Sequence, residues 1–223
     1  MLDAQEADPQ ALADLCQSYW FPLYCYARRL RNTPDDAEDL TQAFFERLLS
    51  RGGFGKADAA RGKLRTFLLR SLHNFANEEW RRGQRQKRGG DVPHVAIDGL
   101  KAEQRIALEP SESVTPEVEF DRAWARQLLE QVLAKLEAAY RDAGKGGLFD
   151  ALHDQLAPGG ATGKPYAQIA EELGVSEPSV RFGAFKLRQR YREMLKEAVA
   201  ETVTSEAEAA EELRHLRSVF GET

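Results

Sequence analysis

Apolar residues recur every three to four positions along almost the whole of this 223-residue chain. This helical period constrains the fold more than any other feature of the sequence. Strand signals are weak, because Val, Ile and Thr seldom cluster and no tight hairpin turn joins alternating runs. We therefore predict an all-α fold. A breaker-rich stretch from Gly89 to Pro116 lacks an apolar face and separates two small helical domains.

The predicted organisation has four parts. Two helical domains occupy residues 1–90 and 118–196, and a linker at 91–117 joins them. An acidic C-terminal extension, expected to be helical, follows at 197–223. We predict that this extension folds back over the basic face of the second domain or over the groove between domains. The alternative is a solvated or frayed terminal helix.

Composition excludes several classes of protein. No apolar stretch approaches the roughly 20 residues of a membrane span, and the acidic N-terminus does not resemble a signal peptide. We therefore expect a cytoplasmic protein without membrane contact. Cys16 and Cys25 match no zinc or redox spacing, so two buried or half-buried thiols are expected. The four scattered histidines predict no metal site, and no cofactor or catalytic residue is expected.

The net charge of −5 conceals a segmented distribution. Residues 51–91 hold 11 basic and 4 acidic side chains, and residues 166–196 hold 6 and 4. The rest of the chain is acidic. Because salt screens charge beyond about 10 Å, local patches and not the net charge decide what a polyanion meets at contact distance. The two basic blocks are therefore candidate polyanion contacts.

Two helices open the first domain. An apolar stripe from Leu12 to Leu30 predicts the first helix, which Pro22 should kink or split. Thr33 and Pro34 are the N-cap and first helical residue expected for the second. The second helix also carries an acidic stripe, which comprises Asp36, Asp39, Gln42 and Glu46. Periodicity alone leaves this stripe as a solvated face or as a docking surface for a basic partner.

The helix expected from about Gly62 to Gly83 has an apolar arc that runs from Leu64 to Phe75. The opposite side combines cations, amides and an aromatic ring. This polar ridge comprises Arg70, His73, Asn74, Asn77, Trp80 and Arg81. Cations contact phosphates, amides contact base edges, and flat rings stack on bases, so the ridge indicates a nucleic acid surface. The alternative is a basic, solvated helix end.

A helix-turn-helix pattern begins at Tyr166. Ala170 lets two helices cross closely, Gly174 can take the positive φ of the turn, and Val180 fills the space between the helices. Ser176 is the expected N-cap of the second helix. The alternative is a chance pair of helices without a DNA-reading role.

The second helix of this pair carries two unusual features. Phe182 and Phe185 are odd on a DNA-reading face. They could contact thymine methyl groups or serve as docking points for another helix. Gly183 costs about 1 kcal/mol relative to Ala in a helix interior, and the sequence supplies no reason for it.

Three segments in this order resemble a known family. Residues 35–45 resemble the polymerase-binding segment of bacterial sigma factors, and residues 62–82 resemble their promoter-melting and minus-10-reading segment. Residues 166–192 are similar to their minus-35-reading helix-turn-helix. The order and two-domain layout resemble the extracytoplasmic-function group of the sigma-70 family. The resemblance covers about residues 12–88 and 118–195.

This resemblance implies a region-two helical bundle, a region-four helix-turn-helix, and a protein that directs promoter recognition without catalysing bond chemistry. The implied partners are promoter DNA and core RNA polymerase, through the β′ clamp helices and the β flap, with an anti-sigma factor as a further candidate. The acidic stripe would contact the clamp helices, and the loop 56–63 would receive a flipped base. The implied DNA contacts are Lys63, Arg65, Arg70, His73, Asn74, Asn77, Trp80, Arg81, Ser176, Glu177, Ser179, Arg181, Lys186 and Arg188.

Two alternatives from other classes stay open. The first is a stand-alone, dimeric helix-turn-helix regulator that binds a palindromic duplex without polymerase. The second is an RNA-processing enzyme, which the lack of a placeable catalytic constellation disfavours.

Overall fold

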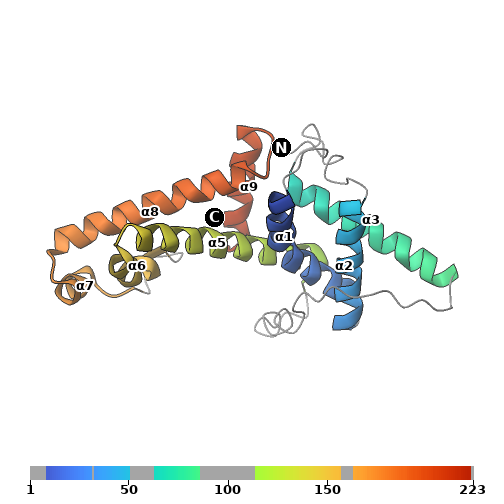
Figure 1. Cartoon of the computed structure of the whole chain (residues 1–223), viewed down its shortest axis with the longest axis horizontal. Helices are drawn as coiled ribbons and strands as arrows, with labels where there is room; N and C mark the ends of the chain where they lie inside the picture. The colour runs from blue at the N-terminus through green and yellow to red at the C-terminus, as the bar shows by residue number, and fades with distance from the viewer. Residues whose placement is uncertain (1–8, 32, 51–62, 86–113, 157–162, 222–223) are drawn as a thin grey trace. The chain divides into compact units, whose positions relative to one another are not determined.

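The computed structural model describes residues 9–31, 33–50, 63–85, 114–156 and 163–221 (Figure 1). Over these ranges the chain forms eight α-helices and one short 3-10 helix, without a strand. The all-α prediction is therefore confirmed. Three predicted features lie partly outside these ranges: the linker 91–117, the loop 56–63 and the basic block 51–91.

The chain divides into two compact units. Unit 1 comprises residues 1–127 and 200–223, and unit 2 comprises residues 128–199. Helix α5 contributes residues to both units, so the domain boundaries expected from the sequence stay a prediction. Each unit has its own buried core.

Unit 1 is built on three helices that pack together and two that flank them. α1 packs against α2, and α3 packs against both. The bounds of its elements are α1 Pro9–Leu30, α2 Pro34–Ser50, α3 Leu64–Arg85, α5 Pro116–Asp142 (in part) and α9 Glu206–Val219. The helical prediction for the C-terminal extension is thereby confirmed.

Pro22 does not divide the first helix. It lies inside α1, which continues without a break to Leu30. Side chains from Tyr19 to Ala27 are buried, and burial of this size outweighs the one backbone hydrogen bond that a proline removes. The expectation that Pro22 could split the helix is therefore wrong.

The start of α2 follows the predicted capping. The backbone N–H of Asp36 donates to Oγ1 of Thr33 at 3.1 Å, and Pro34 is the first helical residue. The apolar face of α2 is buried, and Phe44 packs on Phe75 of α3 with ring centroids 5.9 Å apart. This packing turns the opposite, polar face of α2 towards solvent.

Unit 2 contains the end of α5 and four further elements. These are α6 Gly146–Leu152, the 3-10 helix η3 His153–Leu156, α7 Tyr166–Leu173 and α8 Glu177–Ala200. Gly174 ends α7 with φ 66°, and Oγ of Ser176 accepts from the N–H of Ser179 at 3.4 Å. Ala170 and Val180 are buried in the core between α7 and α8. The expected turn glycine, cap and core residues are all confirmed.

Candidate protein- and nucleic-acid-binding surfaces

The acidic stripe of α2 is open to solvent. Asp36, Asp39 and Glu46 are exposed, and Gln42 is half-buried. Gln42 donates to Oε1 of Glu46 at 3.2 Å, one turn further along the helix. Because the opposite face of α2 is buried, packing holds these carboxylates in a fixed row, as a docking surface requires.

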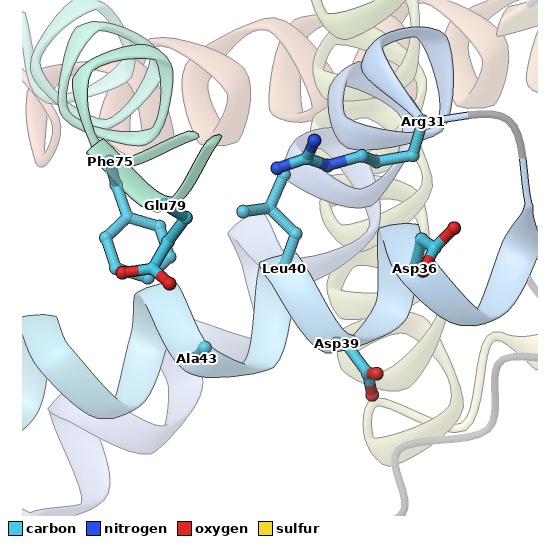
Figure 2. Close-up of a pocket in the computed structure, with 7 residues that line it drawn as sticks. All are labelled: Arg31, Asp36, Asp39, Leu40, Ala43, Phe75 and Glu79. Atoms are coloured by element: carbon cyan, nitrogen blue, oxygen red, sulfur yellow. The ribbon is translucent and has the colours of Figure 1, made fainter. Parts of the chain in front are cut away.

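A cavity of about 360 Å³ lies beside this stripe (Figure 2). Its walls come from the end of α1, the exposed side of α2 and the middle of α3. The lining residues are Arg31, Asp36, Asp39, Leu40, Ala43, Phe75 and Glu79. Figure 2 shows Arg31 extended over Leu40, with Phe75 and Glu79 entering from α3. The sequence predicted the two aspartates but not the α3 wall.

The cavity combines apolar walls with an excess of negative charge. Three carboxylates and one guanidinium line it, together with the side chains of Leu40 and Phe75. An arginine or lysine of a partner fits this chemistry, because its aliphatic stem packs on apolar side chains while its head pairs with carboxylates.

A bracing contact holds the α3 wall in place. Arg47 of α2 forms an ion pair with Glu78 of α3, and its guanidinium lies 5.3 Å from the ring centroid of Phe75. Glu78 and Glu79 also pair with Arg82. The end of α3 is therefore of mixed charge, which its basic sequence run did not indicate.

The polar ridge of α3 is solvent-facing. Its six members, Arg70, His73, Asn74, Asn77, Trp80 and Arg81, are all exposed. Trp80 is 57 % exposed although it is a large aromatic residue. His73 is tied to α1, since its Nδ1 lies 2.7 Å from the hydroxyl of Tyr26. Cations, amides and one exposed ring therefore share a single face of this helix.

Lys63 and Arg65, two implied DNA contacts at the start of α3, are instead paired within the chain. Arg65 binds Glu212 of α9 through two nitrogens, with Nε–Oε2 2.9 Å and Nη2–Oε1 3.1 Å. Lys63 lies 3.0 Å from Glu212 and 3.1 Å from Glu211. Nη1 of Arg65 also donates to Oδ1 of Asp121 in α5. In this structure both cations are therefore paired with carboxylates.

These ion pairs shift the pKa values of the groups that form them. Burial alone would raise the pKa of the Glu212 carboxyl, but the hydrogen bonds and charges of Arg65 and Lys63 hold that pKa below its ordinary value. Burial opposes the charge on Lys63 and on Arg65 too, yet the carboxylates raise both pKa values. All three groups are therefore charged at neutral pH.

An aromatic wall backs the Arg65 side chain. The guanidinium lies 4.9 Å from the ring centroid of Trp124 in α5, and Trp124 hydrogen-bonds the buried hydroxyl of Tyr19. Burial raises the pKa of Tyr19, so this hydroxyl stays neutral. Nε2 of His215 lies 3.0 Å from Oδ2 of Asp121 on the same cluster. No sequence motif pointed to these residues.

The implied DNA contacts of unit 2 lie at the start and middle of α8. Ser176 and Ser179 share a hydrogen bond between their hydroxyls at 2.8 Å. Arg181 pairs with Glu177 one turn earlier, 2.5 Å away. Lys186 is exposed, with its ammonium 5.7 Å from the ring centroid of Phe182. These groups remain accessible from solvent.

Arg188 has a different environment. It is half-buried, and its guanidinium donates to the hydroxyl of Tyr166 at 2.7 Å and to the carbonyl of Gln155 at 3.4 Å. These contacts join α8 to α7 and η3. Arg188 therefore braces the unit, and its implied role in binding DNA stays a prediction. Phe182 and Phe185 are exposed, as the sequence suggested.

Among the described residues, no helix has both the length and the apolar character of a membrane span. No group of His, Cys, Asp or Glu in the same part of the chain could hold a metal ion. Both cysteines there are free thiols, Cys16 half-buried and Cys25 buried, as expected.

Residues 15–86 match the family model for sigma-70 region 2. The match covers most of α1 and all of α2 and α3, with both the acidic stripe and the polar ridge. No curated protein and no solved structure matches the chain.

Proposed function

We propose, from the premise that residues 15–86 are a sigma-70 region 2, that this protein is a bacterial sigma factor. It binds core RNA polymerase and directs promoter recognition and transcription initiation. The region-two match supports this general role. We assign the chain to the extracytoplasmic-function group because a second compact helical unit follows region two. We place it in the cytoplasm, where core polymerase acts, with an anti-sigma factor as a candidate regulator.

The observation that carries the proposal is the pairing of two different surfaces on one small bundle. The acidic stripe of α2 lies on one helix and the polar ridge on another, and both face solvent. A protein that positions DNA on a polymerase needs one surface that binds the polymerase and one that binds the nucleic acid. Both surfaces lie within the matched residues 15–86, which supports the proposal.

The acidic stripe and its cavity are the proposed polymerase contact. Carboxylates of Asp36 and Asp39 flank an apolar floor at Leu40, so a basic helix of the partner could insert a cationic side chain there. We assign this partner surface to the β′ clamp helices. A region-four contact with the β flap would lie in unit 2.

The polar ridge is the proposed contact for the unpaired minus-10 strand. Arg70 and Arg81 would contact phosphates, Asn74 and Asn77 base edges, and Trp80 would stack on a base. In unit 2, the exposed start of α8 would meet the minus-35 duplex in the major groove. Neither role requires a catalytic residue or a cofactor.

Binding to purified core polymerase tests the proposal most directly. We expect wild-type protein to bind core enzyme and to support run-off transcription from its promoter. Asp39→Arg should weaken core binding by about two orders of magnitude, because like charges placed together at an interface cost several kcal/mol. Binding is measured by fluorescence anisotropy of the labelled protein at fixed salt.

Asp142→Arg is the matched control, since Asp142 is an exposed aspartate at the end of α5 in unit 2. It makes the same change in charge and should leave core affinity within about twofold. Equal binding by Asp39→Arg and wild type would refute the polymerase contact. Tight binding of palindromic duplex without polymerase would favour a stand-alone helix-turn-helix regulator instead.

A further inference from the structure

The C-terminal helix α9 is docked on unit 1 and is not a frayed end. The carbonyl of Thr202, just before α9, accepts from the N–H of Leu64 at the first residue of α3, 3.1 Å away. Leu216 is buried and the Glu212 side chain is only 1 % exposed. These contacts place α9 against the start of α3 (Figure 1).

The carboxylate of Glu212 sits where an anion would bind. A guanidinium and an ammonium converge on it, from Arg65 at 2.9 and 3.1 Å and from Lys63 at 3.0 Å. The planar fork of arginine binds a carboxylate and a phosphate with the same two-point geometry. Glu212 is therefore a chemical substitute for a backbone phosphate.

Residues of α5 hold the Arg65 side chain that binds this carboxylate. Trp124 lies under the guanidinium and Asp121 holds another of its nitrogens, so Arg65 has a fixed orientation and is 11 % exposed. Removal of α9 would free Lys63 and open the oriented Arg65 at the start of the helix that carries the polar ridge.

We propose that α9 is an internal competitor for nucleic acid, in which Glu212 and Glu211 occupy the phosphate site formed by Lys63 and Arg65. The site is closed in the free protein and opens when promoter DNA displaces α9. This inference rests on the proposed function, because it takes the polar ridge to be a nucleic acid surface.

Exchange of one anion for another makes such a switch feasible. When α9 leaves, the two cations lose the carboxylates of Glu211 and Glu212 and gain a phosphate, so their charge need not stay uncompensated. DNA binding must supply the free-energy difference between the state with α9 docked and the state with phosphate bound. This difference includes the apolar contacts that Leu216 loses. The apparent affinity for DNA is the intrinsic affinity multiplied by the fraction of molecules in which α9 is displaced.

Single-stranded DNA binding by the full-length protein tests the inference. The probe is a labelled, mixed-sequence single-stranded oligonucleotide, followed by anisotropy at constant salt. Glu212→Gln keeps the shape of the side chain and removes its charge, and should tighten binding about tenfold through a larger open fraction. Circular dichroism of each variant checks that the helices are retained.

Glu206→Gln is the matched control. Glu206 lies on the same helix and is exposed, so the variant removes the same charge without touching the cation pair. It should change affinity by less than about twofold. If Glu212→Gln binds no more tightly than Glu206→Gln, the competition is refuted. The gain should also disappear when Lys63→Gln is added, and a gain that persists would equally refute it.

Hydrogen exchange of the wild-type protein supplies a test that no folding defect can confuse. With core polymerase and saturating promoter DNA, amides of 206–219 should exchange faster and those of 64–72 more slowly than in the free protein. Unchanged or increased protection of α9 would overturn the inference. Failure of the wild type to bind core polymerase would instead overturn the proposed function, so the two failures are distinguishable.

Discussion

The two long helices that carry proposed DNA contacts, α3 and α8, hold their cations in different ways. At the start of α3, Arg65 pairs with a carboxylate 147 residues away in the sequence and is 11 % exposed. On α8, Arg181 pairs with Glu177 of the same helix, one turn earlier, and its side chain is 63 % exposed. One pair depends on tertiary packing and the other only on helix geometry.

This difference separates two ways of presenting charge to a ligand. An exposed pair one turn apart contributes at most about 0.5 kcal/mol, so a phosphate can replace the carboxylate at little cost. A buried pair between elements can be replaced only when a whole helix moves. Arg181 is therefore available as it stands, whereas Lys63 and Arg65 depend on the position of α9.

Removal of the cation tests the comparison with the largest expected effect. Arg65→Met should lower the free energy of unfolding of unit 1 by about 3 kcal/mol, because the Glu212 carboxylate stays buried with a single partner. Arg181→Met should cost at most about 0.5 kcal/mol. Urea titrations followed by tryptophan fluorescence report unit 1, since Trp20, Trp80 and Trp124 all lie there, and circular dichroism reports the whole chain. Equal losses in the two variants would show that burial does not distinguish the Arg65 pair from the Arg181 pair.

Acidification should give a smaller effect of the same origin. The pKa of Glu212 is lowered in the folded protein, so its pairing contributes stability that is fully present above the ordinary value of 4.5. That contribution is lost as the pH falls through the lower, folded-state value. A protonated carboxyl can still hydrogen-bond, so the loss should be less than in Arg65→Met.

Hydrogen exchange of residues 206–219 between pH 6 and pH 3, corrected for the intrinsic rate, measures this loss. Protection of α9 should fall in the wild type as Glu212 is protonated. Other carboxylates also titrate in this range, among them Glu208, whose pKa is lowered by its hydrogen bonds to Thr204. The difference between wild type and Glu212→Gln isolates the pair, and the same acid profile in both proteins would contradict its role.

Features decided by neighbours in the sequence were predicted well. Thr33 caps α2 and Gly174 ends α7 with a positive φ, because each depends on a few adjacent residues. The apolar arcs of α2 and α3 were also correct, since a helix with one apolar face must bury it. The acidic stripe and the polar ridge then face solvent, because they lie opposite the buried apolar faces of α2 and α3.

Features decided by distant segments were not predicted. Tertiary burial kept α1 continuous through Pro22. The position of α9 depends on a cation pair that precedes it by about 150 residues, and local patterns carry no information on such a pairing. One signal was available: Glu212 stands between Ala209 and Leu216 on the inward stripe of α9, where an apolar residue is usual. A carboxylate in an apolar stripe points to a buried cation partner.

Gly183 lies in the middle of α8, and a change at this position should have a small effect on the stability of unit 2. A Cβ added there would lie 3.4 Å from Cδ1 of Leu148 and 3.5 Å from Cδ1 of Leu152, which is ordinary packing distance. Gly183→Ala should therefore stabilise unit 2 by about 0.5–1 kcal/mol, through helix propensity and a reduced entropy of the unfolded chain. Thermal melts followed by circular dichroism measure the gain, while the tryptophan signal of unit 1 should not move. A loss of stability would mean that α6 and α8 must approach more closely than a methyl group allows, and would give this glycine the structural reason that the sequence lacks.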